Sequence, residues 1–134
     1  MRTTARWCAV SVAGAAAVAA LAGSAVAADR ASGAGLALSV HHGESADGAE
    51  LAAATLTCFP VGGSHPHAAA ACRALARAGG RMERIPASTG VCPMIYNPVT
   101  AVASGHWGLR PVRFTHVYPN SCVLGNTLRP VFDF

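Results

Sequence analysis

The fold is decided by residues 54–80, which read ATLTCFPVGGSHPHAAAACRALARAGG. Their first part, 54–59, alternates apolar and polar side chains, and this period of two is typical of a half-buried strand. Pro60-Val61-Gly62-Gly63 then breaks the chain, and an alanine-rich segment with helical spacing of its apolar residues follows. A strand and a helix this close in sequence predict a helix packed on a sheet.

The helix is expected to begin at a cap on Ser64 or His65 and to end at Gly79-Gly80. Pro66 falls in its first turn, where the missing N–H costs no hydrogen bond. The apolar positions form one narrow stripe: Ala68, Ala71, Cys72 and Leu75. Cys72 therefore lies on the buried face, in a position to be bridged to the strand that carries Cys58.

Further strands are expected on both sides of this unit. Apolar residues alternate over 36–40, and again over about 99–104 and 111–118. The last two segments flank Gly105-His106-Trp107-Gly108 and are interpreted as an antiparallel hairpin. The terminal residues 130–134 could add an edge strand. This order predicts an α+β domain, with a helix packed on a single antiparallel sheet.

The N-terminal residues have the pattern of a secretory signal peptide. Two arginines precede an apolar segment, 7–21, and the small residues 23–27 follow it. About 15 apolar residues are too few for a membrane span, which needs roughly 20. We therefore expect a signal peptide at 1–27, a secreted, extracellular domain at 28–134, and no membrane association after cleavage.

Cysteine usage fits an exported domain. Cys8 lies inside the apolar segment and leaves with the signal peptide, so four cysteines remain: Cys58, Cys72, Cys92 and Cys122. Four cysteines in an oxidising compartment imply two disulfides, with three possible connectivities. Pairing in sequence order would close loops of about 15 and about 31 residues, worth about 3 and about 3.7 kcal/mol in the chain-entropy treatment. Zinc is not indicated, because no Cys-x-x-Cys spacing occurs.

The composition argues against a nucleic-acid partner. The chain has ten basic residues, all arginine, six acidic residues and a formal net charge of +4. Loss of the two arginines in the signal peptide lowers the charge of the mature chain to about +2. The arginines are spread along the sequence and are not interleaved with aromatic residues, as they are in nucleic-acid-binding segments.

The residues Cys92-Pro93-Met94-Ile95-Tyr96 have the features of a segment that another protein binds. Proline fixes its own φ and favours extended backbone at the residue before it, and a bridged Cys92 would attach this backbone to the body of the protein. Met94 then offers a long, unbranched apolar side chain. An extended backbone of this kind suits a protease cleft. The alternative is an ordinary core methionine beside a disulfide.

The mature sequence as a whole resembles the Streptomyces subtilisin inhibitor family. The residues that carry the resemblance are Leu56-Thr57-Cys58, His65-Pro66 ahead of Cys72, the run Val91-Cys92-Pro93-Met94-Ile95-Tyr96-Asn97-Pro98-Val99, Gly105-His106-Trp107, Arg113 with the aromatic residue after it, Asn120 just before Cys122, and Val131-Phe132-Asp133-Phe134. The resemblance implies a sheet of about five antiparallel strands with one main and one short helix, a homodimer formed through the sheet face, and disulfides paired in sequence order.

The resemblance also implies the function. Members of the family are not enzymes and need no cofactor; they inhibit serine endopeptidases of the subtilisin type through a protruding, substrate-like loop. Carried over by position, the reactive bond joins Met94 at P1 to Ile95 at P1′. The rest of the protease-binding loop comprises Pro93, Cys92 and Val91 at P2 to P4, and Tyr96 and Asn97 at P2′ and P3′. Asn97 stands where Asp is common, so a salt bridge made by that Asp would be absent here.

Three other functions compete with this interpretation. A secreted metal-binding module is suggested by two close histidine pairs, His41-His42 and His65-x-His67, because imidazole is a common zinc and copper ligand. Adjacent side chains of an extended segment diverge, however, which disfavours the first pair. A secreted hydrolase is disfavoured because no G-x-S-x-G or H-E-x-x-H motif occurs. A purely structural surface protein would not need a proline-stiffened apolar loop.

Overall fold

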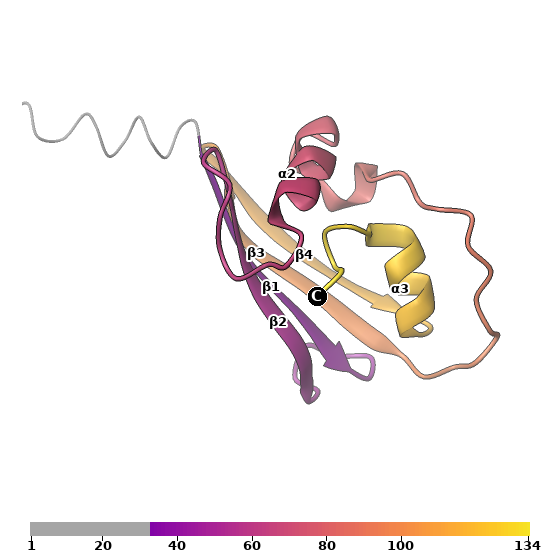
Figure 1. The fold of residues 1–134 in the computed structure, drawn as a ribbon. Helices are drawn as coiled ribbons and strands as arrows, with labels where there is room; N and C mark the ends of the chain where they lie inside the picture. The colour runs from indigo at the N-terminus through magenta and orange to yellow at the C-terminus, as the bar shows by residue number, and fades with distance from the viewer. Residues whose placement is uncertain (1–32) are drawn as a thin grey trace, which may run out of the picture.

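The computed structural model describes residues 33–134 (Figure 1), so the expected signal peptide at 1–27 lies outside the described residues. The elements in chain order are β1 (Ala34–His42), β2 (Glu50–Cys58), α2 (Ala68–Arg77), the 3₁₀-helix η1 (Met82–Arg84), β3 (Val99–Trp107), β4 (Arg110–Tyr118) and α3 (Ser121–Leu128). The strands form one antiparallel sheet in the order β2-β1-β3-β4. The predicted α+β class is confirmed.

Both helices pack on the same face of the sheet (Figure 1). The large residues of the central strand β1 point to this face, and each lies opposite a small residue of β3: Leu36 pairs with Gly105, Leu38 with Ala103 and Val40 with Ala101. This alternation of large and small side chains leaves room for the helices to approach. Leu75 of α2 and Leu128 of α3 complete the core and are almost fully buried.

The bridge Cys58–Cys72 joins the end of β2 to the buried face of α2. It forms because the strand pattern and the helix stripe place one cysteine each on the core side. The helix ends as expected: Arg77 is its last residue, and Gly80 N–H donates to the Leu75 carbonyl (2.7 Å) with Gly79 at a positive φ of 63°.

The start of α2 differs from the prediction. The helix begins at Ala68, and the residue at its cap is His67, not Ser64 or His65. His65 instead lies in the core, where its Nδ1 accepts from His67 N–H (3.0 Å) and its Nε2 donates to the Val131 carbonyl (2.9 Å). A buried imidazole with both nitrogens satisfied fixes the turn before the helix and the C-terminal segment together.

Two expectations about the strands need correction. The described residues form four strands, not about five, and residues 130–134 add no edge strand. The N–H groups of Val131 and Phe132 both donate to the Leu128 carbonyl (2.8 and 3.2 Å), so this segment continues the turn at the end of α3. Its apolar residues Val131 and Phe132 are both buried in the core, and the segment does not pair with the sheet. The short second helix that the resemblance implies is α3.

Candidate functional site

The segment between η1 and β3 forms a long loop that protrudes from the body of the protein (Figure 1). Residues 86–98 contain neither helix nor strand. The side chains of Val91 and Met94 are 98% and 104% exposed, and Ile95 and Tyr96 are also exposed. Met94 is therefore not a core methionine. Four neighbouring exposed apolar side chains mark a surface that another molecule covers.

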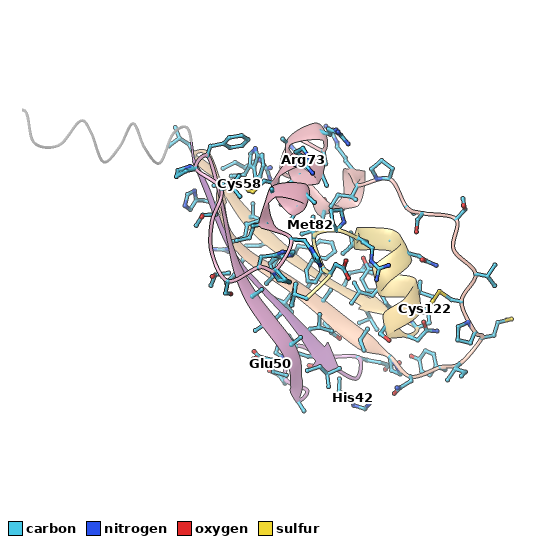
Figure 2. All side chains as sticks on the ribbon, in the orientation of Figure 1. His42, Glu50, Cys58, Arg73, Met82 and Cys122 are labelled. Atoms are coloured by element: carbon cyan, nitrogen blue, oxygen red, sulfur yellow. A yellow bond between two sulfur atoms is a disulfide. The ribbon has the colours of Figure 1, made fainter. Side chains whose placement is uncertain are left out.

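α3 holds the N-terminal half of the loop. Cys92 is bridged to Cys122 in the first turn of α3 (Figure 2), which is the second of the two pairs that the resemblance implies. One turn further, Asn126 Nδ2 donates to the Gly90 carbonyl (2.7 Å). A Cβ at position 90 would lie 2.6 Å from Asn126 Oδ1, so a larger residue there would displace the Asn126 side chain from its contact with the loop.

Asn120 supports the centre of the loop. Its Nδ2 donates to the carbonyls of Pro93 (3.2 Å) and Ile95 (2.9 Å), and its Oδ1 accepts from Val123 N–H (3.0 Å) as the N-cap of α3. Asn120 is buried and lies beneath the loop in a hollow of about 330 Å³ that is otherwise mostly apolar. The Asn120 side chain therefore attaches the loop to α3 on both sides of Met94, the most exposed residue of the loop.

The arrangement leaves the carbonyl of Met94 free while its neighbours are held. Within the described residues, the carbonyls of Pro93 and Ile95 are bonded to Asn120, and the carbonyl between them accepts no hydrogen bond. The carbonyl and the side chain of Met94 are thus both held in place and both free, which suits binding to a site on another molecule that contacts the two groups together.

The hairpin between β1 and β2 supports the C-terminal half of the loop. His42 Nε2 donates to Asn97 Oδ1 (3.1 Å), and the Tyr96 hydroxyl donates to the Glu44 carboxylate. The Asn97 N–H also donates to the Pro119 carbonyl (2.9 Å). Asn97, expected to lose a salt bridge, thus makes a neutral hydrogen bond to His42. Both ends of the loop are attached, but to different parts of the fold.

The Glu44 contact predicts a measurable change in Tyr96. The hydrogen bond to Glu44 raises the pKa of Tyr96, with smaller contributions from desolvation and the carboxylate's charge. A raised pKa means that this contact stabilises the fold fully below the ordinary tyrosine pKa and is lost as the pH rises through the raised value. Glu44→Gln should therefore lower the ionisation midpoint of Tyr96.

This midpoint can be read by ultraviolet titration, because the chain has two tyrosines and Tyr118→Phe leaves Tyr96 alone. Asp47→Asn, which removes a carboxylate from the same hairpin without touching Tyr96, is the matched control and should leave the midpoint in place. An unchanged midpoint in Glu44→Gln would show that the contact does not form in solution.

The histidines do not assemble a metal centre. Within residues 33–134, no group of three or more His, Cys, Asp or Glu side chains is placed to hold a metal ion. His65 uses both ring nitrogens in the core, and His41 contacts the Ser39 hydroxyl and the Gly48 carbonyl (2.9 and 3.0 Å). His42 bonds to Asn97, and His67 lies 3.9 Å from the Asp133 carboxylate, so the ring of each of these four histidines has a partner within the described residues.

Sequence reasoning missed the residues that support the loop: His42, Glu44, Asn120 and Asn126. Only Asn120 carried a usable signal, because asparagine directly before a helix is a common N-cap. Its donors reach residues 25 and 27 positions earlier, and no local pattern indicates such a contact. The bridged cysteines and the exposed Met94 were recognisable because proline and cysteine constrain their own neighbourhood.

A small disulfide-bonded α+β domain with an anchored, exposed loop is the form of a protein that presents a segment to another protein's cleft. The family described as subtilisin inhibitor-like matches residues 32–120, and the chain belongs to this family. It is 40% identical over 144 aligned residues to a subtilase-type protease inhibitor of Streptomyces coelicolor, covering 100% of both chains.

Further similarities agree with this assignment. Subtilisin inhibitor-like protein 1 of Streptomyces cacaoi is 40% identical over 101 residues, which cover 72% of this chain and 92% of that protein. Among solved structures, Streptomyces caespitosus sermetstatin in complex with Bacillus licheniformis subtilisin matches with a TM-score of 0.66 and 34% identity, covering 76% of this chain and 99% of sermetstatin. The resemblance stated from the sequence is confirmed. The family is one of inhibitors, not enzymes.

Proposed function

We propose that this protein inhibits serine proteases of the subtilisin type, with residues 91–97 bound in the protease cleft as a substrate would be. The observation that carries the proposal is the pair of hydrogen bonds from Asn120 to the carbonyls that flank Met94. They hold the backbone on both sides of one exposed apolar residue. Membership of the inhibitor family and the likeness to an inhibitor bound to subtilisin support the same function.

The proposed mechanism places Met94 in the S1 pocket of the protease. Its flexible thioether fills an apolar pocket, and its free carbonyl lies beside the catalytic serine and the oxyanion hole. Val91 supplies a second apolar anchor at P4. Because the bridge to Cys122 and the Asn120 contacts order the loop beforehand, little conformational entropy is lost on binding. If the Met94–Ile95 bond is cut, the same contacts keep the new amine close enough to religate.

The protein is proposed to be secreted. The pattern of residues 1–27 supports a cleaved signal peptide, and two disulfides suit an oxidising compartment. In the part of the chain that the structure describes, no helix is long and apolar enough to cross a membrane.

A homodimer through the open face of the sheet is also proposed. This face, opposite the helices, has a hollow of about 340 Å³ lined mainly by small side chains, among them Ala37, Ser39, Ala53, Thr55, Val102 and Ser104, with Glu50 as its one charged residue. A sheet face of small side chains allows close approach of a second copy. In a two-fold interface of this kind, residues 91–97 of both copies would remain free.

Titration against subtilisin tests the proposed function. Residual activity should fall linearly and reach zero at about one inhibitor chain per protease, because protease–inhibitor complexes of standard size bind at nanomolar affinity or tighter. The mass of the complex should correspond to two inhibitor chains and two proteases. Full activity at a tenfold excess of inhibitor would refute the function, and a complex with one chain of each would refute the dimer alone.

A further inference from the structure

Charge is distributed unevenly over residues 33–134. All seven arginines of this range lie in α2, in or next to η1, in β4 or directly after α3, and the acidic residues of the same region are Glu83 and Asp133. The other carboxylates lie on the β1–β2 hairpin and the start of β2: Glu44, Asp47 and Glu50. In Figure 2, the labelled Arg73 marks the arginine-rich region at the top, and the labelled Glu50 marks the acidic region at the bottom. Four of the seven arginines lie within residues 73–84, and the fold brings Arg110, Arg113 and Arg129 beside them.

Six of these arginines line two hollows on either side of η1. The first hollow, of about 300 Å³, lies between α2 and the end of α3; the second, of about 150 Å³, lies between η1 and the start of β4. The first is lined by Arg77, Arg84 and Arg129, and the second by Arg81, Arg110 and Arg113 together with one acidic residue, Glu83. Residues of η1 line both hollows, and η1 has only three residues, so the two hollows lie close together.

The fold itself uses only two of these guanidinium groups. Arg110 donates to the carbonyls of Gly79 and Gly80 (2.8 and 3.0 Å), and Arg129 pairs with Asp133 (3.2 Å). The other five arginines of residues 33–134 are exposed and have neither a side-chain hydrogen bond nor a carboxylate within 4.0 Å: Arg73, Arg77, Arg81, Arg84 and Arg113. Gathered like charges repel one another, so an external anion would find an unscreened site here.

We propose that these five residues, the arginine face, bind a linear polymer that carries repeated phosphate groups. The planar guanidinium fork matches phosphate oxygens in a bidentate way. A flexible chain can place successive phosphates in both hollows across η1, whereas a planar lipid surface would contact only the ridge between them. The one aromatic residue that lines either hollow, Phe114, is half-buried and packs against the core, so no fully exposed ring offers a platform on which nucleic-acid bases could stack.

The arginine face and the protease-binding loop are separate. None of the residues that line the two hollows falls within residues 91–97 or lines the hollow beneath them, although Pro86, at the start of the same segment, lines the first hollow. The protein can therefore be retained on a phosphate-rich surface while its loop stays free. This inference stands independently of the proposed function, because it uses no residue of the loop.

Binding of long-chain inorganic polyphosphate to the secreted protein tests the proposal. The variant Arg77→Gln/Arg81→Gln/Arg84→Gln should bind at least about 10-fold more weakly at low salt, and the slope of log affinity against log salt should fall by about 3, one for each arginine that no longer pairs with a phosphate. Inhibition of subtilisin by this variant should be unchanged, which also shows that it is folded. An unaltered affinity for polyphosphate would overturn the proposal.

A matched pair of variants separates a local site from overall charge. Arg84→Gln and Ala46→Glu each lower the net charge by one, the first on the arginine face and the second at the exposed hairpin. Only Arg84→Gln should weaken polyphosphate binding, by about 3- to 10-fold. Equal losses in both would overturn the proposal, as would tighter binding to single-stranded DNA or to anionic phospholipid vesicles than to polyphosphate of equal charge concentration.

Discussion

Replacing Met94 with aspartate should weaken inhibition of subtilisin by about three orders of magnitude, or about 4 kcal/mol of binding free energy. Met94 is fully exposed in the free protein and would be fully enclosed in an apolar S1 pocket. A carboxylate there would be stripped of water without a partner. The inhibition constant, measured with a chromogenic peptide substrate, checks the expected loss.

Two further variants at position 94 serve as controls. Met94→Leu retains an apolar side chain of similar volume and should bind within about 10-fold of the original protein. Met94→Lys should gain affinity for trypsin, whose S1 pocket holds an aspartate that Met94 leaves unpaired. Since the side chain contacts nothing in the free protein, none of these changes should shift the melting temperature. If Met94→Asp inhibits subtilisin as well as Met94 does, another residue occupies the S1 pocket.

The elements that could be predicted from the sequence are those that local patterns define. The stripe from Ala68 to Leu75 spans about two helix turns, and the alternation around Leu56 lies within one strand. These two local patterns placed Cys58 and Cys72 on the core side, where they are bridged. The same reasoning failed at residues 130–134, because the neighbouring side chains of Val131 and Phe132 are both buried while their N–H groups bond to the Leu128 carbonyl and not to a strand. Periodicity records burial, and it does not record which backbone groups are paired.

The supporting contacts of the loop and the arginine face could not be predicted, for a common reason. Glu44 meets Tyr96 from a position 52 residues away, and Arg84 meets Arg129 at a shared hollow only after α3 has packed on the sheet. Each of these side chains is polar and exposed, so its sequence position carries no periodic signal. Their roles follow from the topology, which brings the hairpin and α3 beside the loop and, separately, packs α2, η1, β4 and the end of α3 together at the arginine face.

Asn120→Ala should weaken inhibition by about 100-fold and speed hydrolysis of the Met94–Ile95 bond. The change removes both donors that hold the loop and the N-cap of α3. Loss of two partly buried hydrogen bonds and one cap should lower the free energy of unfolding by about 2–3 kcal/mol. Inhibition constants, cleavage followed by mass spectrometry, and denaturant unfolding measure the three effects.

Asn120→Ser distinguishes the contribution of Asn120 to the loop from its contribution to the N-cap of α3. A serine hydroxyl can still accept from Val123 N–H as an N-cap, but it is too short to donate to the carbonyls of Pro93 and Ile95. The serine variant should therefore recover about 1 kcal/mol of stability relative to alanine while inhibiting as poorly as the alanine variant. If serine restored inhibition together with stability, the loop would depend on α3 alone and the two Asn120 donors would be dispensable. If both substitutions lowered stability but left inhibition and cleavage unchanged, rigidity at the reactive bond would come from the bridge to Cys122.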